Sequence, residues 1–228
     1  MRWISIGRVR SVLWHVVRSA LLKTLLRRTL LTASDEWDFD GFADLAADVE
    51  RAGGAEVAYD RPQPIHSFLR YVSAQGNVLF HGTGNGDIRE FRPRRQTDYD
   101  GAWVDAVFAT SDPVWPLFFA VVNRRQARSL INACLPTDHA TYYYFSVSAD
   151  PRAPETWRDG WVYVLPRASF VQHRARSEWM SRVPVRPLAR LHVTPSDFPF
   201  LDEVVEHERG EAILRVVARA TVLRGRAR

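Results

Sequence analysis

A change of hydrophobic pattern near residue 77 is the feature that most constrains the fold of this chain. Before it, apolar residues recur at helical spacing. After it, short apolar runs rich in Val, Phe, Tyr and Trp are separated by Gly, Pro and Asp. Helical segments followed by many short strands are typical of an α+β protein. With 228 residues and a hydrophobic content of 46%, the chain can bury a substantial core.

The pattern divides the chain into three parts. Residues 1–34 are predicted to form a basic amphipathic helical extension, residues 35–76 a helical connecting region, and residues 77–228 an α+β domain. Within the connecting region we expect a helix over 39–52 that stops at Gly53-Gly54. A proline-marked linker follows, and then a second helix that ends at Gly76.

In the third part, short strands are expected over residues 77–83, 105–112, 141–150, 160–173 and 186–198. A helix over 114–127 should begin after the second of them, with Ser111 or Asp112 as its cap and Pro113 at its first position. The segment NACLPTDH, which contains Cys134, is predicted to be a loop. The last two segments, 198–207 and 211–222, fit a short helix or a strand.

The basic charge is concentrated in the first part. Residues 1–34 contain seven basic side chains, and the first carboxylate of the chain is Asp35. The net charge of +5 therefore belongs to this segment and does not indicate a nucleic-acid-binding domain. The helix expected over residues 8–31 is too interrupted by charge to span a membrane. It could lie on an anionic membrane, pack on the domain or a partner, or be an upstream extension.

Several kinds of site find no support. One cysteine excludes an internal disulfide and favours a reducing, cytoplasmic location, and nothing near Cys134 would activate it as a nucleophile. The seven histidines lack HxxxH and HExxH spacing, so no metal site is expected. The run GTGNGD lacks the lysine of a phosphate-binding loop, and it does not open a helix as a dinucleotide fingerprint does.

The segment NVLFHGT places a histidine at the end of an apolar strand and follows it with glycine. It resembles the first motif of the ADP-ribosyltransferase fold, in the diphtheria-toxin and poly-ADP-ribose polymerase branch with a His–Tyr–Glu signature. The resemblance implies that His81 binds the adenine-side ribose of NAD. It also implies that Gly82 and Thr83 belong to the NAD site, with the backbone at Gly82 pairing with the nicotinamide amide.

Two later segments fit the same family in order and spacing. Phe108 ends a strand and Phe119 follows in the next helix, with ten residues between them, where the family has two tyrosines that sandwich the nicotinamide ring. Phenylalanine keeps the ring and lacks the hydroxyl. The family's catalytic glutamate stands at the start of a late strand. Glu178 fits it, since its nearest acidic neighbours in the sequence are Asp159 and Asp197.

The resemblance covers residues 77–198 and implies an ADP-ribosyltransferase-like split β-sheet core that uses NAD as a substrate. Glu178 would stabilise an oxocarbenium-like state at the ribose while His81 positions NAD. The acceptor is open between protein, nucleic acid, a small molecule and water. A catalytically degenerate NAD- or partner-binding module on the same fold is the alternative, favoured by the two phenylalanines. An RNA 2′-phosphotransferase type of enzyme would need arginines near His81, such as Arg92 and Arg94.

Each assignment also has a purely structural interpretation. The ring of His81 can bond to a turn, Phe108 and Phe119 can be core residues, and Glu178 can pair with a nearby arginine on the surface. Convergence of these side chains in the folded chain would favour the site.

Overall fold

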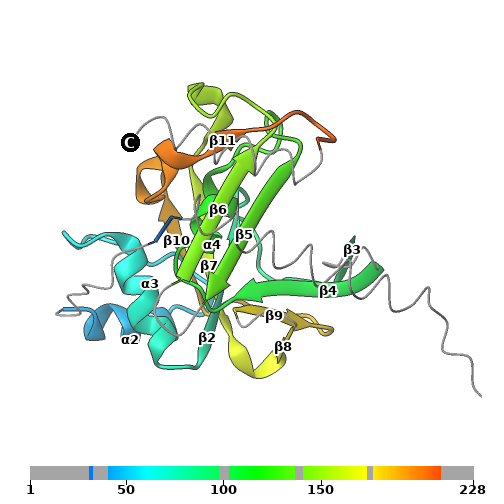
Figure 1. Cartoon of the computed structure of the whole chain (residues 1–228). Coiled ribbons are helices and arrows are strands. Elements are labelled where there is room, and N and C mark those ends of the chain that lie inside the picture. The colour runs from blue at the N-terminus through cyan, green and yellow to red at the C-terminus, as the bar shows by residue number, and fades with distance from the viewer. Residues whose placement is uncertain (1–30, 33–40, 98–102, 137–140, 174–176, 212–228) are drawn as a thin grey trace, which may run out of the picture.

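The computed structural model describes residues 31–32, 41–97, 103–136, 141–173 and 177–211 (Figure 1). These residues form a mixed α+β fold, as the sequence pattern predicts. The helix predicted over residues 8–31 lies outside the described residues except for Leu31, which belongs to a strand. Within the described part of the chain, no helix is long and apolar enough to cross a membrane.

The larger sheet has seven strands and is antiparallel throughout. Its main order is β10-β7-β2-β4-β9-β8, and β3 pairs with β4. The strands are β2 (Val78–Thr83), β3 (Arg94–Thr97), β4 (Trp103–Thr110), β7 (Gly160–Pro166), β8 (Val171–Gln172), β9 (Glu178–Ser181) and β10 (Ala189–Val193). The β3 strand and the outer part of β4 project from the body as an arm (Figure 1).

The smaller sheet is built around β6 (Thr141–Val147). It pairs antiparallel with β1 (Leu31–Thr32) and β5 (Leu130–Pro136), and parallel with β11 (Val205–Glu206). The described residues also contain short 3₁₀ turns at Pro154–Thr156, Arg167–Ser169, Pro195–Asp197 and Leu201–Glu203.

Within the described residues, three α-helices accompany the sheets. The helix α2 (Ala43–Arg51) is followed by Gly53 and Gly54, both at positive φ, and α3 (Ile65–Ala74) is followed by Gly76, also at positive φ. Glycine adopts this left-handed conformation without a steric penalty, so these residues end the helices as expected. The predicted connecting region therefore consists of two short helices that contribute to the main core.

The helix α4 (Trp115–Val121) begins later than predicted and ends early. Its N-cap is Val114 and the proline in its first turn is Pro116, so Pro113 does not take the first helical position. The carboxylate of Asp112 accepts the backbone N–H groups of Val114 (2.9 Å) and Trp115 (2.6 Å), which satisfies donors at the helix start. The expected extension to residue 127 is wrong. Val122 adopts extended backbone and forms a bridge with Trp157, so a β interaction ends the helix.

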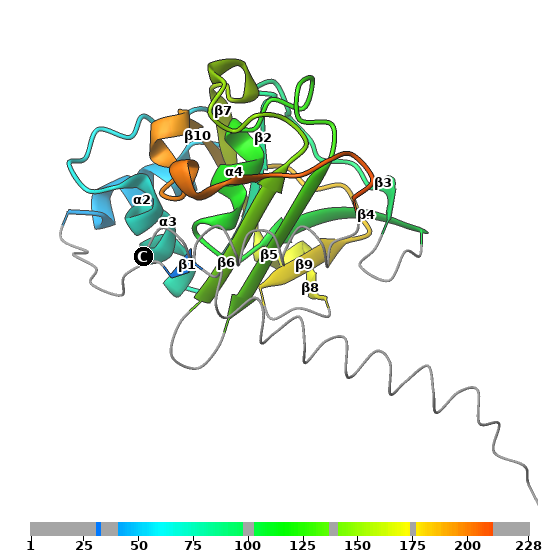
Figure 2. The same ribbon diagram turned by 45° about the horizontal axis from the view of Figure 1, so that its top comes forward.

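The α4 helix lies between the two sheets (Figures 1 and 2). Its Phe118 is fully buried and packs on Phe145 of β6, with ring centroids 4.7 Å apart. The main core continues from α4 to α2 and α3 on one side, where Phe42 and Phe68 meet edge to face. A second, smaller core on the opposite face of the larger sheet includes Leu79 and its neighbours. The central strands β2 and β7 therefore bury side chains on both faces of the larger sheet.

Two glycines set the distance between α4 and the larger sheet. A Cβ atom on Gly82 would lie 1.8 Å from the carbonyl oxygen of Pro116, and one on Gly160 would lie 1.9 Å from that of Ala120. Both contacts are with helix backbone, which cannot rotate away. The two glycines therefore let the helix rest directly on β2 and β7.

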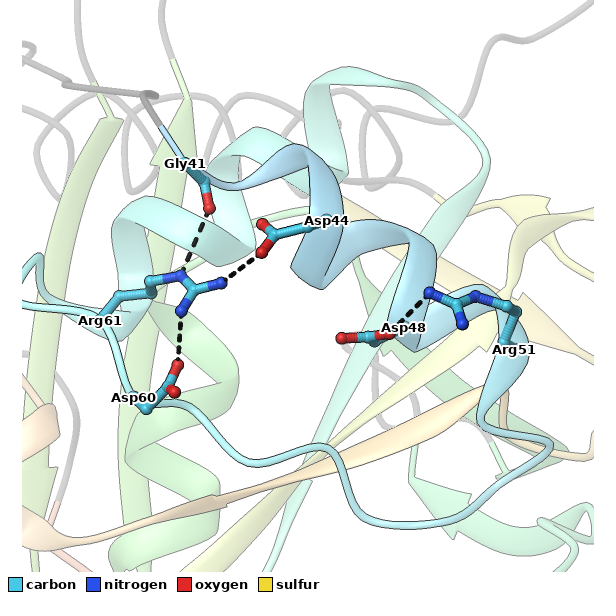
Figure 3. Close-up of polar contacts among 6 residues, drawn as sticks. All are labelled: Gly41, Asp44, Asp48, Arg51, Asp60 and Arg61. Carbon is cyan, nitrogen blue, oxygen red and sulfur yellow. Dashed lines mark hydrogen bonds and ion pairs between the residues drawn. The ribbon is translucent and has the colours of Figure 1, made fainter.

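Arg61 joins the linker after α2 to the start of that helix (Figure 3). Its guanidinium donates to the carbonyl oxygen of Gly41 (3.3 Å) and pairs with Asp44 (2.7 Å) and Asp60 (2.7 Å). Arg51 makes a separate pair with Asp48 on the same helix (2.7 Å). Exposed pairs of this kind stabilise little individually, but three contacts from one guanidinium orient the linker across the helix start.

The predicted loop around Cys134 is wrong, because this residue lies in β5 and pairs with Tyr143. The strand at the edge of the small sheet ends at Pro136, a position where proline removes no ladder hydrogen bond inside the sheet.

The segment predicted over 160–173 is β7, a turn and β8. The segment 198–207 contains a 3₁₀ turn and β11. Apart from Glu211, the segment 211–222 lies outside the described residues.

We predict that Gly82→Ala and Gly160→Ala each lower the free energy of unfolding by about 1–3 kcal/mol, because the new methyl group forces α4 away from the sheet. Chemical denaturation of the two variants measures the change. Gly84→Ala is the matched control. A Cβ atom there meets only the movable guanidinium of Arg158, so we expect a loss within about 0.5 kcal/mol. Equal losses at all three positions would contradict this account of the helix seat.

Candidate functional site

The predicted first and second motifs meet where β2 and β4 separate. These two strands share one register pair, Phe80 with Thr110, whereas β2 pairs with β7 over six positions. At the point of separation the Nδ1 atom of His81 lies 2.8 Å from the carbonyl oxygen of Phe108. The imidazole therefore takes the place of the next ladder hydrogen bond. It joins the histidine of the first motif to the phenylalanine of the second.

This contact defines the protonation of His81. A carbonyl oxygen only accepts, so Nδ1 carries the hydrogen, and in a neutral ring Nε2 is then an acceptor. Burial lowers the pKa of His81, the hydrogen bond to Phe108 opposes this, and the charge of the exposed Arg94 lowers the pKa further. The neutral form therefore prevails at pH 7. His81 can offer an acceptor atom to a hydroxyl group of a ligand.

The backbone of Gly82 points toward the same separation. The N–H of Arg167, just beyond the end of β7, donates a hydrogen bond to the carbonyl oxygen of Asn77, just before β2. Backbone polar groups alternate in direction along a strand, so the N–H and C=O groups of the odd-numbered residues of β2 point toward β7. By alternation, the N–H and C=O of Gly82 point toward β4. On the facing strand, the N–H of Ser111 bonds to Ser177, and the same alternation directs the backbone of Phe108 toward β2. An amide-recognising edge at Gly82 is consistent with this arrangement.

Glu178 is the first residue of β9, the next strand beyond β4. It stands opposite Thr110 in register, and Met180 stands opposite Phe108. Side chains alternate between the faces of a sheet, so Glu178, Thr110 and Phe108 share one face. It is also the face on which α4 rests at Gly82. The carboxylate and the first aromatic ring of the prediction are therefore near neighbours on adjacent strands.

Phe119 lies on α4 beside the part of the helix that contacts Gly82. Its ring is partly exposed and packs with Trp115 (6.1 Å between centroids) and Phe118 (5.6 Å). The ring of Phe108 is also partly exposed, although the residues on both sides of it in β4 are buried. Partial exposure is what a ring needs to contact a ligand, and it is compatible with packing at the edge of the core as well.

His81 differs from the other predicted residues in its orientation. By alternation along β2 its side chain belongs to the face of the second core, where its ring lies 4.8 Å from that of Phe91. It reaches β4 through the gap between the strands. The structure thus brings His81, Phe108 and Glu178 onto three consecutive strands, with the histidine on one side of the sheet and the carboxylate on the other.

The loop after Thr83 is held closely to β7. The hydroxyl of Tyr163 accepts the N–H of Ile88 (3.0 Å) and donates to the carbonyl oxygen of Asn85 (3.1 Å). The side-chain oxygen of Thr83 accepts the N–H of Asn85 (3.2 Å), and Arg158 donates to the carbonyl oxygen of Gly84. The hydroxyl of Thr83 therefore has a structural partner within its own turn.

The arginines that follow the loop differ in their surroundings. Arg92 pairs with Glu90 (2.8 Å), while Arg94 and Arg95 lie on the projecting β3 strand and are exposed. Arg95 stacks over the exposed ring of Trp103 at 5.3 Å. Of the three, the charge of Arg94 influences His81. A role of Arg92 and Arg94 in an RNA 2′-phosphotransferase type of site stays a prediction.

Sequence reasoning missed a buried polar cluster beside Glu178. Tyr143 donates its hydroxyl to Asp112 (2.6 Å), and the thiol of Cys134 lies 3.6 Å from the hydroxyl of Ser177. Burial raises the pKa of Cys134 well above its usual range, and the nearby charge of Asp112 raises it further, which makes it unsuited to act as a nucleophile. Burial also raises the pKa of Asp112, against the hydrogen bonds that it accepts.

A metal centre finds no support in the described part of the chain, where no group of three or more His, Cys, Asp or Glu side chains is placed to hold an ion. The chain was compared with protein-family models, with curated proteins and with solved structures, and none of the three comparisons returned a match.

We predict that the stability of the protein falls as the pH is lowered below about 6.5 and that His81 contributes to the fall. Because the pKa of His81 is lowered in the folded state, the unfolded chain binds a proton there first, and stability is lost as pH drops from the unfolded toward the folded pKa. The slope for one proton is at most about 1.4 kcal/mol per pH unit. Denaturant unfolding at several pH values measures it.

The matched variant is His81→Asn, which keeps an N–H donor near the position of Nδ1 and does not titrate. We expect its stability to depend less on pH in this window than that of the unaltered protein. The pKa of His66 is also lowered by burial, so this second histidine remains in both proteins as a common background. If the free energy of unfolding depends on pH equally in the two proteins, folding does not lower the pKa of His81.

Proposed function

We propose that this protein cleaves NAD at the nicotinamide riboside bond and transfers the ADP-ribose group to an acceptor or to water, on an ADP-ribosyltransferase-like split core. The observation that carries the proposal is the hydrogen bond from His81 to Phe108 at the separation of β2 and β4, with Glu178 on the adjacent strand. Residues from three distant segments that resemble the three family motifs are neighbours through backbone pairing and this one contact.

The proposed binding contacts come from both faces of the larger sheet, with His81 on one side and Phe108 and Glu178 on the other. In the proposed site the Nε2 acceptor of neutral His81 takes a hydrogen bond from a ribose hydroxyl. The backbone N–H and C=O of Gly82, directed toward β4, pair with the carboxamide of nicotinamide. The partly exposed rings of Phe108 and Phe119 contact the two faces of the nicotinamide ring. These contacts use ring surface and backbone, and neither requires the tyrosine hydroxyls of the family.

Glu178 supplies the chemistry. The bond between C1′ of the ribose and the nicotinamide nitrogen breaks, and its electron pair neutralises the pyridinium. Positive charge then develops on the ribose, and a fixed carboxylate close to the ribose hydroxyls stabilises it. The acceptor nucleophile bonds to C1′ and gives its proton to solvent. The proposal concerns the NAD half of the reaction, and the acceptor stays open between protein, nucleic acid, a small molecule and water.

A catalytically degenerate module that binds NAD or a partner is the second candidate. The phenylalanines at positions 108 and 119 favour it, because ring stacking is retained while two hydroxyl groups that orient the ligand in the family are absent. Retention of Glu178 at the start of β9, on the same face as Phe108, favours the enzyme. A carboxylate at that position has no use in stacking alone.

The decisive test follows release of nicotinamide from NAD by the purified protein, beside Glu178→Gln. We expect the amide variant to bind NAD with similar affinity and to lose roughly 100-fold or more in kcat, because it removes the negative charge that acts in the transition state. Calorimetry measures binding, and nicotinamide release measures turnover.

The control is His81→Asn, which should weaken NAD binding because it lacks the Nε2 acceptor while keeping the donor to Phe108. NAD binding by the unaltered protein without turnover would support the degenerate module. Absence of both binding and turnover would refute the proposed NAD site, and the hydrogen bond of His81 would then be purely structural.

A further inference from the structure

The hydroxyl of Thr110 occupies a junction between the strand of Phe108 and the strand of Glu178. It donates to the carbonyl oxygen of Ser177 at 2.8 Å and accepts the backbone N–H of Asp112 at 3.0 Å. The Thr110 residue is only 7% exposed, so water cannot readily replace either bond. Both the donor and the acceptor capacity of one hydroxyl are therefore used inside the protein.

The Ser177 carbonyl is held by two bonds from the end of β4. Besides the hydroxyl of Thr110, the backbone N–H of Ser111 donates to it at 3.0 Å. Ser177 directly precedes Glu178, the first residue of β9. Fixing the peptide plane before Glu178 limits the directions in which its side chain can leave the strand. The two bonds thus fix the backbone position from which the side chain of Glu178, the proposed catalytic residue, leaves the strand.

On its other side, Thr110 is connected to the start of α4 through Asp112. The Asp112 backbone donates to Thr110, and its carboxylate accepts the first N–H groups of the helix that carries Phe119. The same carboxylate accepts the hydroxyl of Tyr143 on β6. One side chain at the end of β4 therefore links the carboxylate strand to the helix with the second aromatic ring.

We infer that Thr110 is a positioning residue for Glu178: its hydroxyl holds the Ser177 peptide and so aligns the carboxylate with the ribose of bound NAD. This inference rests on the proposed function. It extends that function to a residue that touches no ligand, since Thr110 is buried and both of its hydrogen bonds are internal. A displacement of the catalytic group by about 1 Å can cost on the order of 100-fold in rate.

The test compares kinetic constants for nicotinamide release. Thr110→Val has nearly the same shape and lacks the hydroxyl. We expect kcat to fall at least about 10-fold while KM for NAD stays within about twofold, because Glu178 acts in the transition state and NAD is held by other residues. Thr110→Ser restores the hydroxyl and should restore kcat. If Thr110→Val does not fold, Thr110→Ala removes the same group with less demand on packing.

The matched control is Tyr143→Phe, which removes another buried hydroxyl from the same cluster and leaves the Thr110–Ser177 bond in place. We expect it to lower the melting temperature as Thr110→Val does, yet keep kcat within about twofold of the unaltered protein. An unchanged kcat in Thr110→Val, or equal losses in both variants, would overturn the inference and leave the proposed function intact. An unaltered protein that releases no nicotinamide would overturn the proposed function, and with it the inference.

Discussion

The direct contact of α4 with the backbones of β2 and β7 is the constraint on which the rest of the structure depends. Gly82 and Gly160 allow it, because a methyl group at either position would collide with helix carbonyl groups. The helix in turn buries Phe118 against the smaller sheet and carries Phe119 beside it. The lack of a side chain at these two glycines therefore sets the spacing between the two sheets and the distance of α4 from β2.

This constraint gives Gly82 a structural role independent of any ligand. A glycine after a strand histidine suits close approach of a ligand to the backbone, and it equally suits close approach of a helix. In this structure the two uses lie in different directions: α4 covers the face of the glycine, while its N–H and C=O point sideways toward β4. The packing of α4 therefore leaves the proposed amide recognition at Gly82 geometrically feasible.

Local sequence signals predicted much of the fold. The glycines after α2 and α3 and the strand VLFHGT each follow from short-range chemistry. The strand around Cys134 could not be predicted from local sequence, because Asn, Pro, Thr and Asp in that segment are residues typical of turns. Its pairing with β6 outweighs their local preference. The helix after Pro113 was predicted too long for a similar reason, since the bridge from Val122 to Trp157 is a tertiary contact.

The candidate site shows the same division. Family-like spacing identified His81, Phe108 and Glu178 as candidates, and the structure shows that they occupy consecutive strands. The sequence spacing could not indicate the His81–Phe108 hydrogen bond. This bond joins residues 27 apart and arises only because β2 and β4 separate after one register pair. Nor could the spacing single out Thr110. A threonine at the end of a strand is an ordinary β residue, and its role comes from the Ser177 carbonyl that the folded chain places beside it.

The phenylalanines at 108 and 119 determine how orientation must be achieved if NAD is the substrate. Rings without hydroxyl groups hold nicotinamide by stacking, and stacking leaves rotation in the ring plane weakly restricted. Directional contacts must then come from polar groups at the rim: the backbone of Gly82, the acceptor nitrogen of His81 and the carboxylate of Glu178. All three lie on strands whose positions are tied to β4 by hydrogen bonds. The proposed site thus depends on the accuracy of its backbone more than a site with two tyrosines would. A buried hydroxyl that locks that backbone, as Thr110 does, is a reasonable counterpart to the hydroxyls that the rings lack.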